Sequence, residues 1–121
     1  APLGGLVRRG VPVALHSDFA MAPAAPLFLA WTAITRETQS GNVFGPDERL
    51  TIDQAMKAIT IDAAYILHLE DRLGSIEAGK LADFSVLDQD PYAVGAAGLR
   101  SIKVWGTVFE GVAYPAKAVA L

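Results

Sequence analysis

Three adjacent polar residues, His16, Ser17 and Asp18, directly follow a short apolar run at residues 11–15. The run lacks polar alternation, which predicts a strand covered on both faces, as in parallel sheets. Reactive groups of α/β enzymes project from the carboxyl ends of such strands, and a carboxylate there can move a proton. Asp18 is therefore the first catalytic candidate. The competing interpretation is a loop aspartate that caps the following turn, and the residues taken alone favour it.

The neighbours of Asp18 are candidates for contacts with a substrate. His16 precedes it by two residues, so on an extended chain both side chains point to the same side. His16 can reach a metal pocket or a substrate, or it can be hydrogen-bonded within the mouth of the fold, and the sequence leaves both open. Phe19 and Met21 can line a substrate pocket, although such side chains more often pack in a core. Ser17 has no base in a recognisable triad, so we assign it no nucleophilic role.

Length and composition exclude several classes of protein. The chain has 121 residues, 52% hydrophobic and 19% charged, which suffices for one globular domain with a core. A net charge of −3 with scattered Lys and Arg gives no basic surface for nucleic acid. No apolar run reaches the roughly 18 residues that a membrane-spanning helix needs. We therefore expect a soluble, cytoplasmic protein with neither a membrane nor a nucleic-acid partner.

The spacing of apolar residues predicts helices first and strands afterwards. Helices are predicted over residues 3–9, from Pro26 to about Arg36, from Thr51 to Ala58, and after Thr60. A polar loop is predicted over residues 37–49. After Gly74 and Gly79 the period changes to two, which predicts strands over 82–88, 102–110 and 112–114, with 90–98 as a connection. A parallel strand with helices followed by antiparallel strands indicates two structural units.

A series of motifs in this order resembles the carboxyl-terminal part of the amidohydrolase superfamily of metal-dependent hydrolases. The resemblance is to its family 3, the YtcJ-like or formamide-deformylase-like branch. It covers most of the chain, including the helix after Pro26 and residues 104–111. The matching motifs are VALHSD (13–18), FGPDERL (44–50), TIDAAY (60–65), LED (69–71), GSIEAGKLADF (74–84) and LDQDP (87–91).

The resemblance implies an α/β fold made of two pieces. Residues 1–73 would be the last strand and helices of a (β/α)8 TIM-like barrel, and therefore a carboxyl-terminal fragment of that barrel. Residues 74–121 would be antiparallel strands of a small composite β-sandwich, whose other half comes from the amino terminus of the longer protein.

The resemblance also implies an activity: hydrolysis of a C–N bond in an amide, formamide or cyclic amide of a small molecule by metal-activated water. Asp18 matches the family's aspartate after the eighth strand, which is both a metal ligand and the proton shuttle. His16, Phe19 and Met21 are then expected to contact the substrate. The cofactor is expected to be a divalent metal, zinc.

The other metal ligands of the family have no counterpart here. The family pattern needs a His-x-His pair, a bridging Lys or Glu and two further histidines, whereas the chain contains only His16 and His68. One carboxylate does not make a zinc site. We therefore expect the fragment to be inactive alone, and to self-associate or to pair with the missing amino-terminal part. The alternative is a non-catalytic scaffold or binding protein that retains the fold.

Overall fold

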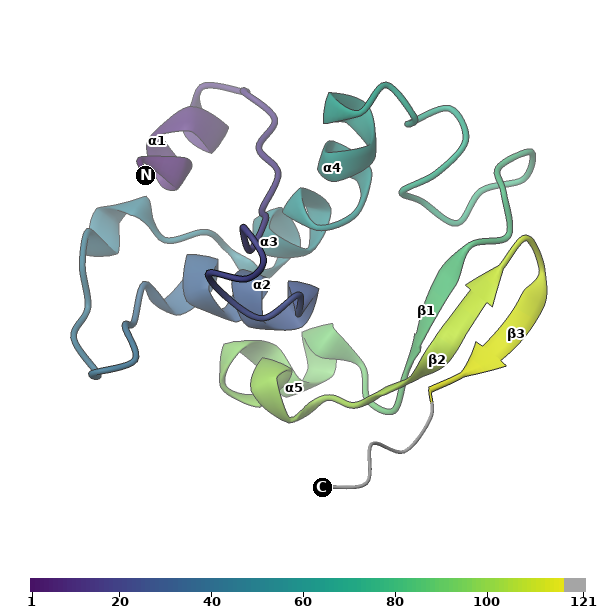
Figure 1. Ribbon diagram of the computed structural model, residues 1–121. Coiled ribbons are helices and arrows are strands. Elements are labelled where there is room, and N and C mark those ends of the chain that lie inside the picture. The colour runs from purple at the N-terminus through teal and green to yellow at the C-terminus, as the bar shows by residue number, and fades with distance from the viewer. Residues whose placement is uncertain (117–121) are drawn as a thin grey trace.

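A group of short helices lies beside a three-stranded antiparallel sheet (Figure 1) in the computed structural model, which describes residues 1–116. None of the helices in these residues is long and apolar enough to cross a membrane. The four helices predicted before residue 74 are confirmed. In chain order the elements are α1 (Leu3–Arg8), α2 (Pro26–Thr35), the 3-10 helix η1 (Pro46–Glu48), α3 (Ile52–Ala58), α4 (Ile61–Ile66), β1 (Phe84–Leu87), α5 (Pro91–Gly98), the 3-10 helix η2 (Leu99–Ser101), β2 (Val104–Phe109) and β3 (Val112–Pro115).

Local signals define the ends of α2 and α3. Pro26 occupies the first position of α2, where a missing N–H costs nothing, and Arg36 closes the helix in the left-handed conformation. At α3 the Thr51 hydroxyl accepts the Gln54 amide at 3.2 Å, while the Gln54 side-chain oxygen accepts the Thr51 amide at 2.9 Å. This reciprocal capping box satisfies two amides that the helix leaves unpaired, so α3 begins where the sequence predicts.

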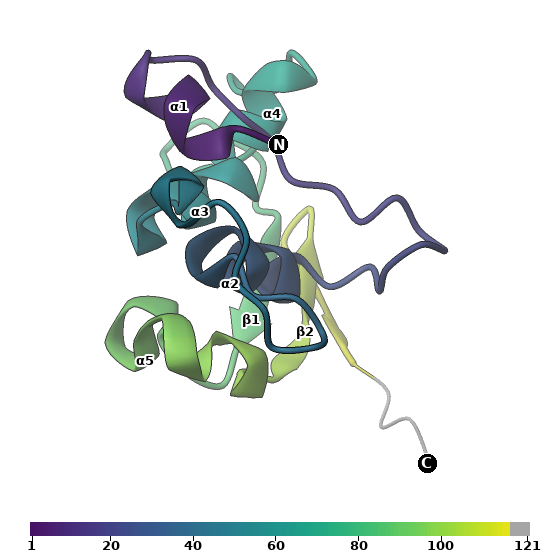
Figure 2. The ribbon, with the colours of Figure 1, turned by 90° about the vertical axis from the view of Figure 1, so that its left-hand side faces the viewer.

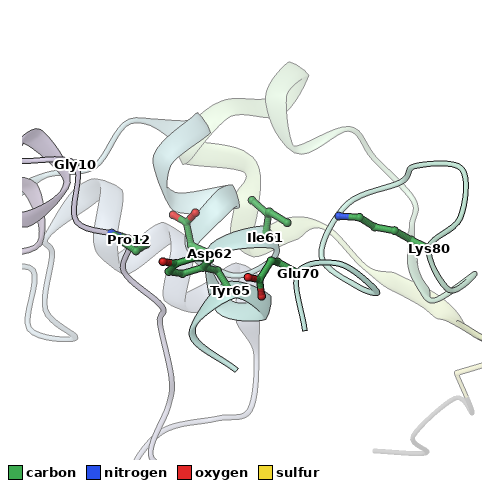
Figure 3. Close-up of a pocket in the computed structure, with 7 residues that line it drawn as sticks. All are labelled: Gly10, Pro12, Ile61, Asp62, Tyr65, Glu70 and Lys80. Atoms are coloured by element: carbon green, nitrogen blue, oxygen red, sulfur yellow. The ribbon is translucent and has the colours of Figure 1, made fainter. Parts of the chain in front are cut away.

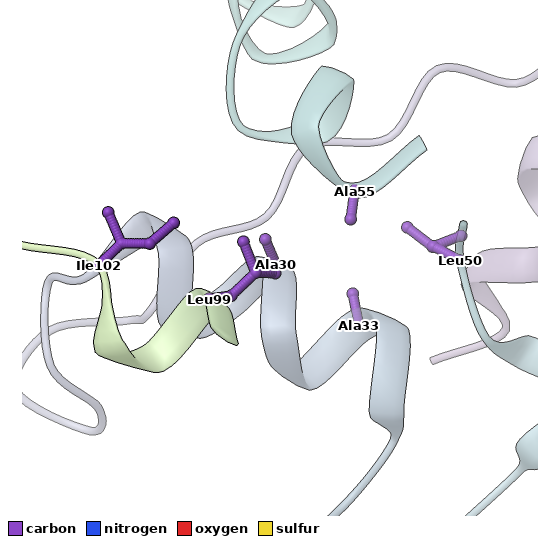
Figure 4. Close-up of a cluster of buried hydrophobic side chains, with 6 residues drawn as sticks. All are labelled: Ala30, Ala33, Leu50, Ala55, Leu99 and Ile102. Carbon is purple, nitrogen blue, oxygen red and sulfur yellow. The ribbon is translucent and has the colours of Figure 1, made fainter. Parts of the chain in front are cut away.

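The core is built around small side chains that let helices approach closely. Ala30 and Ala33 of α2 face Ala55 of α3, and all three are buried (Figure 4). The seam also receives side chains from the second half of the chain, because Leu99 of η2 is fully buried in the same cluster. The buried cluster consists of Ala30, Ala33, Leu50, Ala55, Leu99 and Ile102.

The sheet has the order β1-β2-β3, and all three predicted strands are confirmed. β2 and β3 form a hairpin through Glu110 and Gly111, whose φ angles of 48° and 81° fit the two-residue turn that matches strand twist. The Asp83 carboxylate accepts the Glu110 amide at 2.6 Å. Asp83 therefore anchors the hairpin turn to the chain that leads into β1.

The predicted strand over residues 11–15 is wrong for this chain. These residues form no strand, and the Leu15 amide instead donates to the Ala58 carbonyl at the end of α3, at 3.1 Å. Val13 is nevertheless buried, with 7% of its surface exposed. The physical reason is that a strand needs a neighbour to complete its hydrogen bonds, and none of the strands at residues 1–116 lies alongside this segment.

The predicted connection over residues 90–98 is also corrected, because it contains helix α5. Pro91 occupies the first helical turn and the Asp90 carboxylate accepts the Tyr92 amide at 2.8 Å. The sequence does not predict this helix because it contains two glycines, which have low helix propensity. Gly95 interrupts the helix with a φ of 62°. The helix nevertheless packs against the same cluster through Val94.

The turn after α4 gives a stability prediction with a matched control. Gly74 has a φ of +89°, and a Cβ there would lie 2.8 Å from the Ala64 Cβ and the Ile61 Cα. Gly79 has a similar φ of +95° but open space around it. Gly79→Ala should lower the free energy of unfolding by about 1–2 kcal/mol through backbone strain alone. Gly74→Ala should lose about 1–3 kcal/mol more through overpacking. Denaturant unfolding measures both, and equal losses would contradict the close packing of Gly74 on α4.

Candidate active-site loop

The candidate residues lie on the segment that joins α1 to α2. After Leu15 this segment leaves the helices and extends away from them, to the right in Figure 2, before it returns at Pro26. Both ends of the excursion are fixed: the Leu15 amide donates to Ala58 at the end of α3, and Pro26 begins α2. The loop is therefore held at both ends by the packed pair of helices, while Asp18, Phe19 and Met21 between them are exposed.

Main-chain hydrogen bonds shape the loop around Asp18. The Asp18 amide donates to Nδ1 of His16 at 3.2 Å, and the Asp18 carbonyl accepts the Met21 amide at 2.7 Å. The second bond closes a tight turn over residues 18–21, and Asp18 takes a φ of 47°. Aspartate adopts this left-handed conformation more readily than most residues.

The Asp18 carboxylate is available for chemistry. Asp18 is exposed, and within residues 1–116 no hydrogen bond or ion pair engages its side-chain oxygens. The turn that follows is closed by the backbone of Asp18 and not by its carboxylate, so the capping role that the sequence alone favours is not seen. His16 is also exposed, and its ring is turned back onto the Asp18 amide.

The two predicted apolar contacts lie in the same turn. Phe19 and Met21 are 77% and 84% exposed, far more than packed core side chains would be. Because Met21 is three residues after Asp18 across a closed turn, their backbones lie close together. The structure therefore places His16, Asp18, Phe19 and Met21 on one short loop, with two large apolar side chains beside one carboxylate and one imidazole.

The side chains on this loop could supply one metal ligand but not a complete metal centre. No group of three or more His, Cys, Asp and Glu side chains in residues 1–116 is placed to hold a metal ion. His68 lies outside this loop, in the segment between α4 and β1. A carboxylate is a chemically suitable ligand for a divalent cation, but catalytic zinc usually takes three protein ligands.

A separate cavity of about 470 Å³ lies near the start of the same segment, away from Asp18. Asp62 and Tyr65 of α4 line it together with Pro12, and Lys80 approaches from the turn before β1 (Figure 3). Sequence reasoning gave no signal for this cavity, because its lining comes from residues far apart in the chain. None of the predicted site residues contributes to it.

Lys80 at the edge of this cavity belongs to a small polar network. Its ammonium donates to the Ser75 hydroxyl at 2.5 Å, and that hydroxyl donates to the Glu77 carboxylate at 2.5 Å. The Ser75 hydrogen bond and then the nearby Lys80 charge hold the pKa of Glu77 below its usual range. The network stiffens the turn over residues 74–80, which is a structural role.

Comparisons with known proteins match this chain to a deformylase and to amidohydrolases. It is 39% identical to the N-substituted formamide deformylase of Arthrobacter pascens over 92% of this chain and 20% of that protein. It is 33% identical to a Bacillus subtilis protein described as amidohydrolase YtcJ, over 88% of this chain and 21% of that protein. The chain thus spans about a fifth of the length of these curated relatives.

The fold and a family model agree with these relatives. The crystal structure of an amidohydrolase from Thermotoga maritima superposes with a TM-score of 0.65 at 28% identity, covering 94% of this chain and 26% of that one. The family model described as the amidohydrolase family matches residues 1–114, which is nearly the whole chain. On these grounds the chain belongs to the amidohydrolase family, within its YtcJ-like and formamide-deformylase-like branch.

Proposed function

We propose that this chain is the carboxyl-terminal part of a metal-dependent hydrolase that cleaves a C–N bond in an amide, formamide or cyclic amide. Family membership and the deformylase relative support the bond type. In the longer protein, residues 1–73 would close a (β/α)8 barrel and residues 74–121 would contribute to a composite β-sandwich. The last five residues of that second range lie outside the described part of the chain.

The single observation that carries the proposal is the position of Asp18. Its carboxylate stands on an exposed loop directly after the apolar segment, engaged by no partner within residues 1–116. A group placed in this way can accept a proton from the attacking water and deliver it to the leaving nitrogen. Both transfers occur at the Asp18 side-chain oxygens, so one carboxylate serves as base and then as acid.

The proposed cofactor is a divalent metal, zinc, for which Asp18 would be one ligand. Such an ion, when bound, lowers the pKa of water toward neutrality and polarises the substrate oxygen. Its remaining ligands would come from parts of the longer protein outside this sequence. Phe19 and Met21 would contact the substrate, because two large apolar side chains left exposed beside a reactive carboxylate gain from covering an apolar group of a small molecule.

Replacing the carboxylate tests the catalytic role. In the full-length protein Asp18→Asn keeps the size of the side chain but removes its ability to take a proton, so hydrolysis should fall by roughly 10²–10⁴-fold or more. Asp71→Asn is the matched control, because Asp71 is also exposed and lies outside the loop. Circular dichroism should show an unchanged fold in both variants. Turnover at the wild-type rate in Asp18→Asn would overturn the assignment.

The sequence upstream of Ala1 separates an enzyme from a scaffold. If the longer protein is the proposed enzyme, that sequence should encode a His-x-His pair, a bridging Lys or Glu and two further histidines, because a lone carboxylate cannot hold the cation. Reading the genomic open reading frame checks this. A reading frame that encodes barrel strands without these residues would favour the scaffold.

The isolated 121-residue chain should be inactive and should self-associate. The register of β2 and β3 puts Trp105, Phe109, Val112 and Tyr114 on one face, and each is about half exposed. We propose that the rest of the longer protein covers this apolar face, so copies of the isolated chain should meet through it. Size-exclusion chromatography with light scattering should give oligomers, and a variant with Trp105→Ser and Tyr114→Ser should shift toward monomer. A clean wild-type monomer would contradict this.

A further inference from the structure

One nitrogen of the His16 imidazole is hydrogen-bonded to the backbone of Asp18. Nδ1 accepts the Asp18 amide at 3.2 Å, so that nitrogen carries a lone pair and no proton. In the neutral ring the proton therefore sits on Nε2. Within residues 1–116 no other hydrogen bond involves the ring. The contact to Asp18 is thus what orients this side chain.

Asp18 needs such a contact because little else holds it. Its φ of 47° lies in the left-handed region, which is unfavourable for a residue with a Cβ. Asp18, Phe19 and Met21 are all exposed, so packing within the described residues does not fix the loop. Two hydrogen bonds remain: the Asp18 amide donates to Nδ1 of His16, and the Asp18 carbonyl accepts the Met21 amide. Together they set the direction in which the Asp18 Cα–Cβ bond points.

We propose that His16 is a positioning residue, which holds the backbone of Asp18 through Nδ1 and so aims its carboxylate at the reacting centre. This inference rests on the proposed function, since it assigns a role to the neighbour of the proposed catalytic group. His16 contacts neither the cation nor the substrate through Nδ1, because that nitrogen is already occupied. A small misplacement of a catalytic group is costly, so the contact affects turnover more than substrate binding.

Side-chain geometry suggests variants that test the roles of the two His16 ring nitrogens separately. The Oδ1 atom of asparagine, like Nδ1 of histidine, is bonded to Cγ, so His16→Asn preserves an acceptor for the Asp18 amide and removes Nε2. His16→Gln carries its polar atoms one carbon further out, nearer the position of Nε2. His16→Ala removes both. His68→Asn is the control, because His68 is also exposed and lies outside the loop, between α4 and β1.

The experiment measures kcat and KM for the metal-loaded full-length protein on a formamide substrate, together with bound metal by mass spectrometry. His16→Ala and His16→Gln should lower kcat about 10- to 100-fold with little change in KM. His16→Asn should recover to within about threefold of wild type and keep its metal, because it retains the acceptor. His68→Asn should match wild type. Rescue by His16→Gln but not by His16→Asn, or equal losses in all three His16 variants, would overturn the positioning role.

A structural readout keeps this inference separate from the proposed function. If the wild-type protein hydrolyses no amide, the proposed function fails, but crystal structures of the variants still test the contact. In His16→Asn the new side-chain oxygen should accept the Asp18 amide and φ of Asp18 should stay positive. In His16→Ala that angle should move to the ordinary negative range or the loop should lose order. An unchanged Asp18 conformation in His16→Ala would overturn the inference.

Discussion

Close packing of alanines between α2 and α3 is the constraint on which the rest of the structure depends. Ala30 and Ala55 have no exposed surface, so any larger side chain would push the helices apart. The two helices hold both ends of the candidate loop, because Pro26 begins α2 and Ala58, at the end of α3, accepts the Leu15 amide. Packing of these alanines therefore sets where the loop begins and ends, and Asp18 lies between those two points.

Between these fixed ends, the conformation of the loop depends on local hydrogen bonds. The helices fix where the loop starts and ends, but its tip is exposed and is shaped by its own backbone and by His16. This division is common in enzymes, in which a rigid scaffold carries a loop that supplies the reactive group.

Much of the fold could be predicted from the sequence, because its signals are local. Thr51 with Gln54, Pro26, and the alternation that leads into β1 and β2 each act within a few residues of the structure they specify. The strand predicted over residues 11–15 failed because pairing depends on a neighbour, which composition cannot supply. The sequence pattern does not predict helix α5 because Gly95 interrupts it, but in the structure the partly buried Val94 of this helix packs against the core cluster.

The candidate site could be predicted only in part. Residue type and position after an apolar run pointed to Asp18, but the sequence left His16 open between two roles. The hydrogen bond from the Asp18 amide to Nδ1 of His16 depends on the left-handed conformation of Asp18. No pattern in the sequence predicts that conformation. The sequence also does not predict the cavity beside Tyr65, because the residues that line it come from separate segments of the chain.

The most direct test of the central claim is a crystal structure of the full-length protein with its divalent cation, located by anomalous scattering. The account predicts an Asp18 side-chain oxygen in the coordination sphere, about 2.0–2.2 Å from the ion if it is zinc. A complete metal centre formed without Asp18, with its carboxylate directed into bulk water, would contradict the account.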